Sequence, residues 1–597
     1  MDMYNPIPRP EHPNPQWERK NWTNLNGTWA FEIDKSCSGE FRGLIEAQTL
    51  SDTITVPFCP ECAMSGVEHK DFMNCVWYKK TISLTKADLE GNRVLFHIGA
   101  CDYETKVWVN GQSTGFSHKG GYTPIDLDIT KFVTEGDNLI TIAAYDDIRS
   151  FRQPGGKQSA QYGSYRCYYT RTTGIWQTVW YEIVPENYIR YAKFTPDATN
   201  GTVMIEAELE GTADFSAEVW FEGRKVGEGC KKNRFTTAQL EITLSETHLW
   251  DLGQGNLYDV VLKFGKDEVK SYFGLRTIEL RDGKFYLNGR SVFQRLVLDQ
   301  GYYPESLTTA PSEEALIKDI ELGFMAGFNG ARMHQKVFEP RYIYHADRMG
   351  YMVWGEYGSW SIDISGEEAV AWFLPEWLES VRRDYSHPSI ITWCPFNETW
   401  DTHFHHQNKY SREQNNDVVR IIYEQTKVAD PTRPCVDASG NYHVKTDIFD
   451  VHDYEQDPAI FRANYDKLVT DNELWDRHHL RHRFNGRTQG VRQTWKGEPI
   501  HVSEYGGIGF KLEGNDTERK SAWSYGKTTG SYEEFYARYE GLTTAILDNP
   551  RIFGLCYTQL TDVEQEKNGL FEYESRAPKF DMNIISEINK RKAAVED

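Results

Sequence analysis

The chain has 597 residues, more than one hydrophobic core usually holds, so about two to four domains are expected. Its apolar content of 39% and charged content of 26% are typical of a soluble globular protein. The formal net charge of -22 argues against nucleic acid or an anionic membrane surface as a partner, because phosphate groups need a basic surface.

The N-terminal segment MDMYNPIPRPEHP has neither a basic start nor an apolar stretch, so we expect no secretion signal. No segment approaches the ~18 consecutive apolar residues of a membrane span. The expected location is therefore the cytoplasm. The sequence leaves open whether the chain forms a homo-oligomer.

The ten cysteines are scattered, and several lie inside apolar runs, as buried free thiols do. Cys59 and Cys62, with His69 and Cys75, are a candidate zinc ligand set, but their spacing is not that of a common finger. We therefore expect no metal and no other cofactor. Two histidine-rich stretches are likewise expected to be solvated loops: HFHH at 403–406 and RHHLRHR at 477–483.

The first third of the chain is predicted to be β structure, with short segments rich in aromatic and β-branched residues. Asn110-Gly111 is a strong hairpin signal among them. Strands at this spacing, with turn residues between them, predict a jelly-roll sandwich over residues 1–185. The predicted strands are VWYKKTISL (76–84), NRVLFHIGA (92–100), YETKVWVNGQ (103–112) and NLITIAAYDD (138–147).

A second β region is expected over residues 186–280. Apolar and polar residues alternate there with a period of two, most clearly in VMIEAELEG and AEVWFEGRKVGEG. Its length of roughly 90 residues suits an immunoglobulin-like sandwich.

After residue 280, apolar strand candidates alternate with helical patterns. Eight such units in roughly 300 residues predict a (β/α)8 TIM barrel over 281–597. The polar and basic stretch 455–499 is expected to be a loop on the active face. Helices are expected at 311–328, 366–385, 412–429 and 531–548. Strands are expected at 291–298, 329–334, 351–357, 390–397, 435–439, 448–454, 500–505 and 552–560.

Two of these strands end on a glutamate: the fourth at Glu398 and the seventh at Glu504. Catalytic groups of such barrels lie at the C-terminal ends of strands, so the two carboxylates are expected to meet in one pocket. A carboxylate pair there is typical of glycoside hydrolysis, in which one acid protonates the departing oxygen and the other attacks the anomeric carbon or activates water. The alternative is that each is a structural acid paired with a neighbouring arginine.

Motifs along nearly the whole chain are similar to those of one enzyme family. They are PRPEHPNPQWERKNWTNLNGTWAFEID, TRTTGIWQTVWYE, NGARMHQ, HPSIITWCPFNETW, VSEYGGI and YTQLTDVEQEKNGLF. In these the chain resembles glycoside hydrolase family 2, the β-galactosidase, β-glucuronidase and β-mannosidase family. The resemblance implies a retaining exo-β-glycosidase with Glu398 as acid/base and Glu504 as nucleophile. It also implies that Asn397 binds the sugar 2-hydroxyl.

The resemblance implies further contacts at the barrel mouth. Arg332 is similar to the family arginine that keeps the nucleophile ionised, and Tyr454 to the tyrosine that hydrogen-bonds it. The alternatives are a structural ion pair for Arg332 and a core position for Tyr454. Trp523 and Trp360, after the seventh and third strands, are candidate sugar platforms, with plain packing as the alternative.

The sequence departs from familiar members of the family at positions that bear on the sugar. Asp401 stands where many members have glycine. The first strand ends without the histidine of the best-known galactosidases and glucuronidases. Asp299 and Gln300, at this strand end, are expected to contact sugar hydroxyls instead.

The segment Glu566-Lys567-Asn568 matches the place where glucuronidases carry an Asn-x-Lys pair that grips the substrate carboxylate. A glutamate at its first position would repel an acidic sugar. We therefore expect a terminal neutral sugar, with a β-galactoside first. The alternatives are a β-glucuronidase or β-galacturonidase, an α-L-arabinopyranosidase, and a catalytically inactive carbohydrate-binding protein on the same scaffold.

Overall fold

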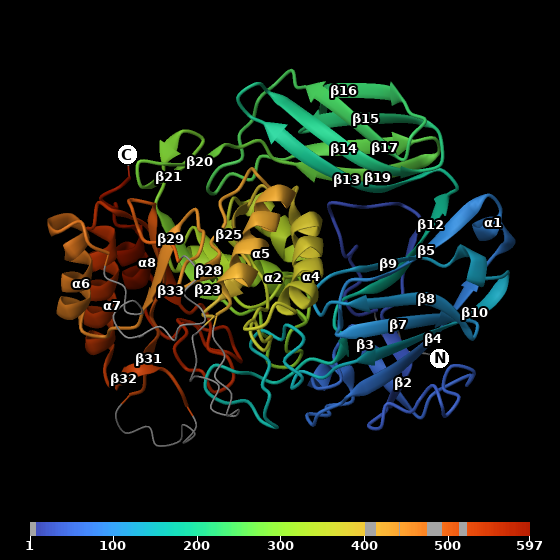
Figure 1. Ribbon diagram of the computed structural model, residues 1–597, viewed down its shortest axis with the longest axis horizontal. Coiled ribbons are helices and arrows are strands. Elements are labelled where there is room, and N and C mark those ends of the chain that lie inside the picture. The colour runs from blue at the N-terminus through green and yellow to red at the C-terminus, as the bar shows by residue number, and fades with distance from the viewer. Residues whose placement is uncertain (1–6, 400–413, 441, 475–491, 513–521, 597) are drawn as a thin grey trace.

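The computed structural model describes residues 7–399, 414–440, 442–474, 492–512 and 522–596. These residues form an N-terminal jelly-roll sandwich, an immunoglobulin-like sandwich and a C-terminal barrel, so the predicted fold class is confirmed. In Figure 1 the barrel lies on the left, the jelly roll on the right and the immunoglobulin-like sandwich above them. The stretches 403–406 and 477–483, and Asp401, lie outside the described residues.

The N-terminal sandwich packs a four-stranded sheet, ordered β1-β12-β5-β9, against a six-stranded one, ordered β3-β2-β4-β10-β7-β8. Asn110 and Gly111 have φ angles of 53° and 76° and form the turn between β7 and β8, as a two-residue hairpin requires. The elements are β1 Trp22–Asn24, β2 Gly27–Ile33, β3 Asp52–Val56, β4 Cys75–Leu84, α1 Lys86–Leu89, β5 Asn92–Ile98, β6 Cys101–Asp102, β7 Glu104–Val109, β8 Gln112–Lys119, β9 Ile125–Asp128, β10 Gly136–Tyr145, β11 Gly174–Ile175 and β12 Val179–Pro185.

The immunoglobulin-like sandwich packs the sheets β13-β14-β17 and β16-β15-β18-β19 around a core of its own. The buried and half-buried residues alternate along β14, which matches the period of two in its sequence. Its strands are β13 Tyr188–Asp197, β14 Thr202–Glu210, β15 Asp214–Phe221, β16 Arg224–Lys232, β17 Thr237–Thr243, β18 Tyr258–Phe264 and β19 Asp267–Phe273. A small sheet follows, of β20 Ile278–Arg281, β21 Lys284–Leu287 and β22 Arg290–Ser291.

The barrel is built on seven parallel strands ordered β26-β25-β24-β23-β33-β30-β29. These are β23 Gln294–Asp299, β24 Gly330–Met333, β25 Met352–Glu356, β26 Ile390–Cys394, β29 Phe449–Asp453, β30 Ile500–Gly506 and β33 Ile552–Thr558. Shorter strands are β27 Phe396–Asn397, β28 Ala438–Ser439, β31 Ile508–Phe510 and β32 Tyr525–Thr529. The helices are α2 Glu313–Met325, α3 Pro340–Met349, α4 Ala369–Asp384, α5 Asn416–Ala429, α6 Pro458–Thr470, α7 Tyr532–Leu547 and α8 Met582–Lys590.

The fifth predicted strand, 435–439, is reduced to the two residues of β28, which pair with β27 outside the seven-stranded sheet. Pro395 separates β26 from β27 and has no N–H to continue the ladder. Cys435 still bridges to Trp393 on β26, so the ring continues through this contact.

The stretch 455–499 was predicted to be a loop throughout, and this is wrong for its first part, which contains helix α6. Asp457 caps this helix by accepting from the backbone N–H groups of Ala459 and Ile460, and Pro458 occupies its first position. The sequence therefore carried a helix start signal that the polar composition obscured. Helices α3 and α8 were also not predicted.

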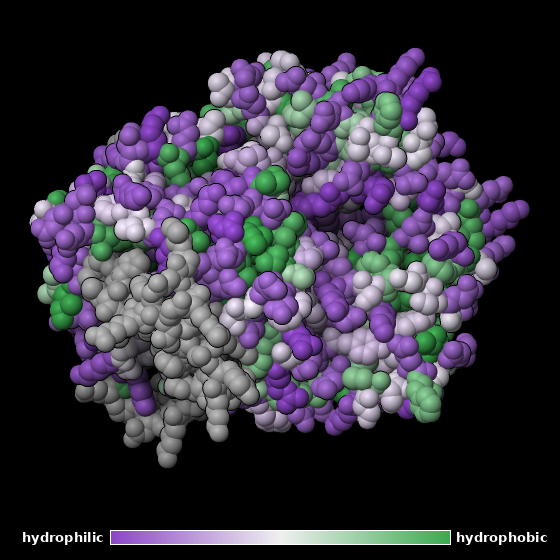
Figure 2. Space-filling view, in the orientation of Figure 1, coloured by the Kyte–Doolittle hydropathy of each residue, from purple (hydrophilic) through white to green (hydrophobic). Residues whose placement is uncertain are grey.

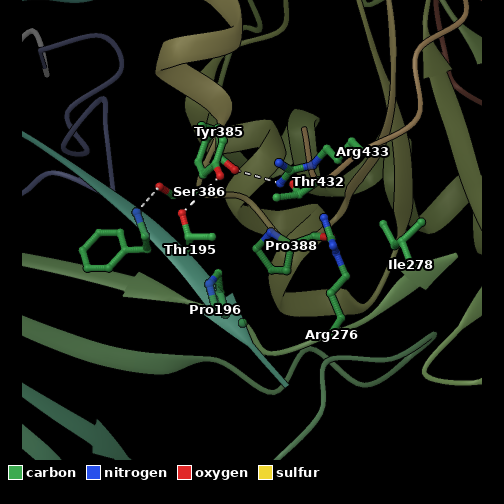
Figure 3. Close-up of a pocket in the computed structure, with 11 residues that line it drawn as sticks. Thr195, Pro196, Arg276, Ile278, Tyr385, Ser386, Pro388, Thr432 and Arg433 are labelled. Carbon is green, nitrogen blue, oxygen red and sulfur yellow. Dashed lines mark hydrogen bonds between the residues drawn. The ribbon is translucent and has the colours of Figure 1, made fainter. Parts of the chain in front are cut away.

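The immunoglobulin-like sandwich is docked on the barrel by a polar junction (Figure 3). The backbone N–H of Phe194 donates to Ser386 Oγ at 3.1 Å, and the hydroxyls of Thr195 and Tyr385 lie 3.1 Å apart. Arg276 donates to the backbone carbonyls of Pro388 and Ile390, which orders the segment entering β26. The junction therefore fixes the base of the strand that leads to Glu398.

The jelly roll also contacts the barrel directly. Trp176 of the jelly roll belongs to the same buried apolar cluster as the barrel strands, and its backbone carbonyl accepts from Thr309 Oγ1 of the barrel at 2.6 Å. The long loop between β10 and β11 runs from the jelly roll toward the barrel (Figure 1). Residues of this loop can therefore contribute to the barrel mouth.

Hydrophilic residues dominate the face shown in Figure 2, and hydrophobic ones form small scattered groups. The large hydrophobic side chains that are exposed are likewise spread along the described chain, as is ordinary for a globular surface. No helix within the described ranges has the length and apolar character needed to cross a bilayer.

Candidate active site

The structure brings Glu398 and Glu504 together at the carboxyl ends of barrel strands. An oxygen of each carboxylate and a ring nitrogen of His452 lie within 4.8 Å of one another. Retaining glycosidases place their two carboxyl groups about 5–5.5 Å apart, whereas inverting ones leave about 6.5–9.5 Å for a water molecule. The spacing here corresponds to the retaining arrangement.

Glu398 directly follows β27, and its backbone conformation directs it into the mouth. Its φ angle is 47°, in the left-handed region that non-glycine residues rarely adopt, and its N–H donates to Ser439 O at 2.9 Å. Trp360 Nε1 donates to the carbonyl of the preceding Asn397 at 2.9 Å. The surrounding loops therefore hold the turn on which Glu398 sits.

Glu504 lies inside strand β30, where its side chain is almost fully buried. Arg332 Nη1 donates to Glu504 Oε1 at 3.2 Å, and the Tyr454 hydroxyl donates to Glu504 Oε2 at 2.5 Å. A cation and a hydroxyl donor both favour the ionised carboxylate. These two donors hold the Glu504 carboxylate in a fixed orientation.

Arg332 links the two strand ends. Besides Glu504, it ion-pairs with Glu356 and donates to Ser503 O at 2.7 Å and to Asn397 Oδ1 at 3.0 Å. The guanidinium is fully buried, and these bonds use N–H groups on all three of its nitrogens. Arg332 therefore has both the structural ion pair and the contact with Glu504 that the sequence left as alternatives.

The amide of Asn397 is oriented by this arginine. Because Oδ1 accepts from Arg332, Nδ2 is directed away from it, and Nδ2 has no hydrogen-bond partner among the described residues. A buried donor without a partner is costly unless a ligand satisfies it. This geometry suits a hydrogen bond to a sugar hydroxyl beside the two carboxylates.

His452, which the sequence analysis did not single out, lies between the two glutamates. Its Nδ1 is 2.8 Å from Glu398 Oε1 and 3.4 Å from Glu504 Oε2. On the other side of the ring, Nε2 is 3.0 Å from Ser439 Oγ. Burial lowers the pKa of His452, but Glu504 and Glu398 outweigh burial and raise it above the usual value.

The position of one proton follows from these contacts. On the Nε2 side the Ser439 hydroxyl gives its hydrogen to Asp450 and can accept from His452, whereas Arg332 Nη1, 3.4 Å from the same nitrogen, can only donate. Nδ1 and Glu398 Oε1 would be two facing acceptors at 2.8 Å unless a proton lay between them. The Glu398–His452 pair therefore holds one proton between Nδ1 and Oε1.

We expect His452→Asn to move the alkaline limb of the pH–rate profile to lower pH by at least about one unit. The raised pKa of His452 means that the pair keeps its proton to a higher pH than an ordinary imidazole does and loses it as the pH rises further. A carboxyl group alone loses its proton about two units below an imidazole. The measurement is kcat/KM from pH 4 to 10, with the half-exposed His248→Asn as control; an unchanged alkaline limb in His452→Asn would contradict this role.

Aromatic rings line the mouth around this group. The rings of Tyr454 and Tyr525 are stacked, and Trp523 meets Tyr525 edge-on with centroids 4.7 Å apart. On the other side, Trp360 packs against Tyr168 of the jelly-roll loop. Trp523 and Trp360 are half-buried, so each keeps an exposed part that a sugar ring can contact.

Asp299 and Gln300, the two residues expected to contact the sugar at the first strand end, hydrogen-bond to other groups of the protein. Asp299 accepts from the Gly301 backbone N–H at 2.9 Å and from the Tyr342 hydroxyl at 3.3 Å. Burial and Asp319 raise its pKa to about 7, which marks a separate buried acidic cluster. Gln300 donates to Gln559 Oε1 at 2.8 Å, at the end of β33.

Glu566, at the position where glucuronidases carry asparagine, is buried in the wall of the barrel mouth. It accepts from the Tyr169 hydroxyl at 2.5 Å and from Asn568 Nδ2 at 3.1 Å. Trp523 pairs with this segment through the backbone, donating to Gln565 O at 2.8 Å. The jelly-roll loop, the eighth strand's loop and Trp523 are therefore joined beside the two glutamates.

His334 is a further residue that the sequence analysis missed. Its Nδ1 lies 3.1 Å from Glu356, its Nε2 lies 3.8 Å from Glu504, and burial lowers its pKa well below the usual value. Its place two residues after Arg332, at the end of a barrel strand, was a usable signal. Within the described part of the chain, Glu398, His452 and Glu504 are also the group whose ligand atoms are close enough to hold one metal ion.

Profiles of one family match three segments of the chain. "Glycosyl hydrolases family 2, sugar binding domain" matches residues 22–153, "Glycosyl hydrolases family 2" matches 187–276, and "Glycosyl hydrolases family 2, TIM barrel domain" matches 278–589. The last covers more than half of the chain by itself.

Individual relatives are distant. The chain is 26% identical over 443 residues to a "Putative beta-glucuronidase" of Formosa agariphila, covering 70% of this chain and 51% of that protein. It is 25% identical over 393 residues to a "Beta-galactosidase" of Thermoanaerobacter pseudethanolicus, covering 61% and 51%. The match thus spans about half the length of these relatives. A solved "Uncultured Clostridium sp. Beta-glucuronidase" has the same fold, with a TM-score of 0.75 at 19% identity over 99% of this chain and 100% of that one.

Proposed function

The chain belongs to glycosyl hydrolase family 2, and from this premise we propose that it is a retaining exo-β-glycosidase that releases a terminal neutral sugar. The observation that carries the proposal is the pair Glu398 and Glu504, with carboxylate oxygens within 4.8 Å of each other although their strands are not neighbours in the barrel. Relatives named as β-galactosidase and β-glucuronidase support a glycosidase of this family without choosing between those sugars.

In the proposed mechanism the reaction proceeds in two displacements. Glu504, ionised beside Arg332 and Tyr454, attacks the anomeric carbon while Glu398 gives its proton to the departing oxygen. Glu398 then takes a proton from water, which attacks the glycosyl–enzyme ester and releases the sugar with its original anomeric configuration. Asn397 Nδ2 is placed to bind the 2-hydroxyl, a contact that strengthens as positive charge develops on the sugar ring.

The proposal of a neutral sugar rests on the buried wall residues that follow β33. Glu566 stands where a glucuronidase offers asparagine, and Asn568 where it offers lysine; both are buried. A substrate carboxylate beside Glu566 would have to lose its water next to a like charge, a penalty of several kcal/mol. A β-galactoside or an α-L-arabinopyranoside needs only hydroxyl partners.

A second candidate is a β-glucuronidase or β-galacturonidase, and one observation favours it. The ammonium of Lys157 is buried near the glutamates and has no hydrogen bond or ion pair with any described residue. This cation is an alternative partner for a substrate carboxylate.

We expect kcat/KM for a 4-nitrophenyl β-galactoside or α-L-arabinopyranoside to exceed that for the β-glucuronide and β-galacturonide by at least about tenfold. The reason is the charge of Glu566, which an acidic sugar would face. A panel of these four substrates, with the β-mannoside and β-fucoside for comparison, checks it. A uronide rate above both neutral rates would overturn the neutral-sugar proposal and favour the second candidate.

A further inference from the structure

The loop that carries Lys157 comes from the jelly roll and is fastened to the barrel. The backbone N–H of Gly155 donates to Trp360 O at 2.8 Å, and that of Gly156 donates to Gly358 O at 2.9 Å. Gly156 has a φ angle of 55°, and a Cβ there would lie 2.2 Å from Gln335 O. Only glycine fits this approach, so the loop is held against the segments that follow β24 and β25.

This attachment places the Lys157 side chain over the face of Trp360, with Nζ 4.5 Å from the ring centroid. The same indole donates to the backbone carbonyl of Asn397, next to Glu398. Trp360 therefore contacts both Lys157 and the backbone next to Glu398, the proposed acid/base residue. A cation–π contact of this kind orients an ammonium while leaving its three N–H donors free for other partners.

Lys157 is only 5% exposed, yet its ammonium makes no hydrogen bond or ion pair with the residues that the structure describes. Its pKa is nevertheless raised: burial lowers it, and Cys167, Glu566, Glu504 and Glu398 together outweigh burial. A ligand oxygen within reach of this ammonium would give it the hydrogen-bond acceptor that the described residues do not provide.

Glu566 is connected to the same loop. The Tyr169 backbone N–H donates to Lys157 O at 2.8 Å, and the Tyr169 hydroxyl donates to Glu566 Oε2 at 2.5 Å. The lysine and the glutamate therefore share one tyrosine as their support. Since Glu566 uses its oxygens on Tyr169 and Asn568, its influence on a ligand near Lys157 is mainly that of its charge.

We propose that Lys157 is a substrate-binding residue supplied by the jelly roll, and that Glu566 sets its specificity. Lys157 donates to an oxygen of the sugar bound between Glu398 and Glu504. The negative charge of Glu566 balances the ammonium, so the pair accepts a hydroxyl in preference to a carboxylate. This inference rests on the proposed glycosidase function and names the residues that would give it its preference for a neutral sugar.

The experiment compares the wild type, Lys157→Met, Glu566→Gln and the double variant on a 4-nitrophenyl β-galactoside and β-galacturonide, which differ only at C6. Lys157→Met is expected to lower kcat/KM on the galactoside by about 10- to 100-fold, the effect of losing a charged hydrogen bond. Glu566→Gln is expected to raise the galacturonide-to-galactoside ratio by about tenfold, because the ammonium is then unbalanced. The double variant is expected to lose that gain.

Lys119→Met is the matched control, because Lys119 lies on the same domain with its side chain 64% exposed. Circular dichroism and a thermal melt show whether each variant is folded. Lys157→Met within twofold of the wild type on both substrates would overturn the binding role. A wild-type preference for the galacturonide, or a Glu566→Gln ratio that does not change, would overturn the role of Glu566. If the wild type hydrolysed neither these nor any other glycoside, the proposed function itself would fail.

Discussion

Glu504→Gln is expected to lower kcat by on the order of 10⁴-fold or more on every substrate that the wild type hydrolyses. The amide is nearly isosteric with the carboxylate but cannot attack the anomeric carbon. It also replaces the anion that Arg332 and Tyr454 hold in place, so the developing positive charge on the sugar loses its counterion. Neither the leaving group nor the pH should restore the rate.

The measurement is single-substrate kinetics on an activated aryl glycoside and on an alkyl glycoside. Glu533→Gln, in the exposed first turn of α7, is the control for the same change of side chain elsewhere. The melting temperature distinguishes a catalytic loss from a folding defect, since Glu504 is buried. A folded Glu504→Gln variant within tenfold of the wild type would show that the nucleophile is another group.

Glu398→Ala is expected to give losses that depend on the leaving group. For an alkyl glycoside, whose departing oxygen needs a proton, kcat/KM should fall by about 10³- to 10⁴-fold. For a 2,4-dinitrophenyl glycoside, which departs as a stable anion, the fall in kcat/KM should be about tenfold or less. Hydrolysis of the glycosyl–enzyme ester also needs Glu398 as base, so the ester should accumulate.

Sodium azide provides the second readout for this variant. A small anion that needs no general base can enter the space left by the Glu398 side chain and attack the ester, so kcat on the dinitrophenyl substrate should rise with azide and a β-glycosyl azide should form. Glu398→Gln keeps the volume of the side chain and is expected to respond less to azide. Equal losses on all leaving groups, with no azide product, would contradict the acid/base role.

The positions of Glu398 and Glu504 were predictable because each stands at the end of an apolar segment, and barrel topology brings such ends to one face. The pair could therefore be inferred from local patterns plus one rule of topology. Arg332, at the end of β24, was named from the family resemblance and not from this pattern. The strand-end pattern alone did not give the contacts of Asp299, because a strand-end carboxylate can also turn toward a neighbouring helix, as Asp299 does toward Tyr342 on α3.

His452 and Lys157 were not predictable in this way. The role of His452 depends on Ser439 and Glu398, which belong to other strand ends, and no spacing in the sequence records those contacts. Lys157 lies in a loop of a different domain, and only the docking of Gly155 and Gly156 on the barrel brings it to the mouth. Helix α6 is a different case: its start at Asp457-Pro458 was readable, but its polar surroundings suggested a loop.

The measurement that tests the central claim most directly is the anomeric configuration of the first product. The claim is that Glu398 and Glu504 act as a double-displacement pair, with carboxylate oxygens within 4.8 Å of each other. Proton NMR during the first minutes of hydrolysis of the best substrate in the panel distinguishes the anomers before they interconvert. The account predicts that the anomer with the configuration of the substrate appears first and that the other follows only by mutarotation. Initial release of the opposite anomer would contradict the covalent mechanism and the roles assigned to both glutamates.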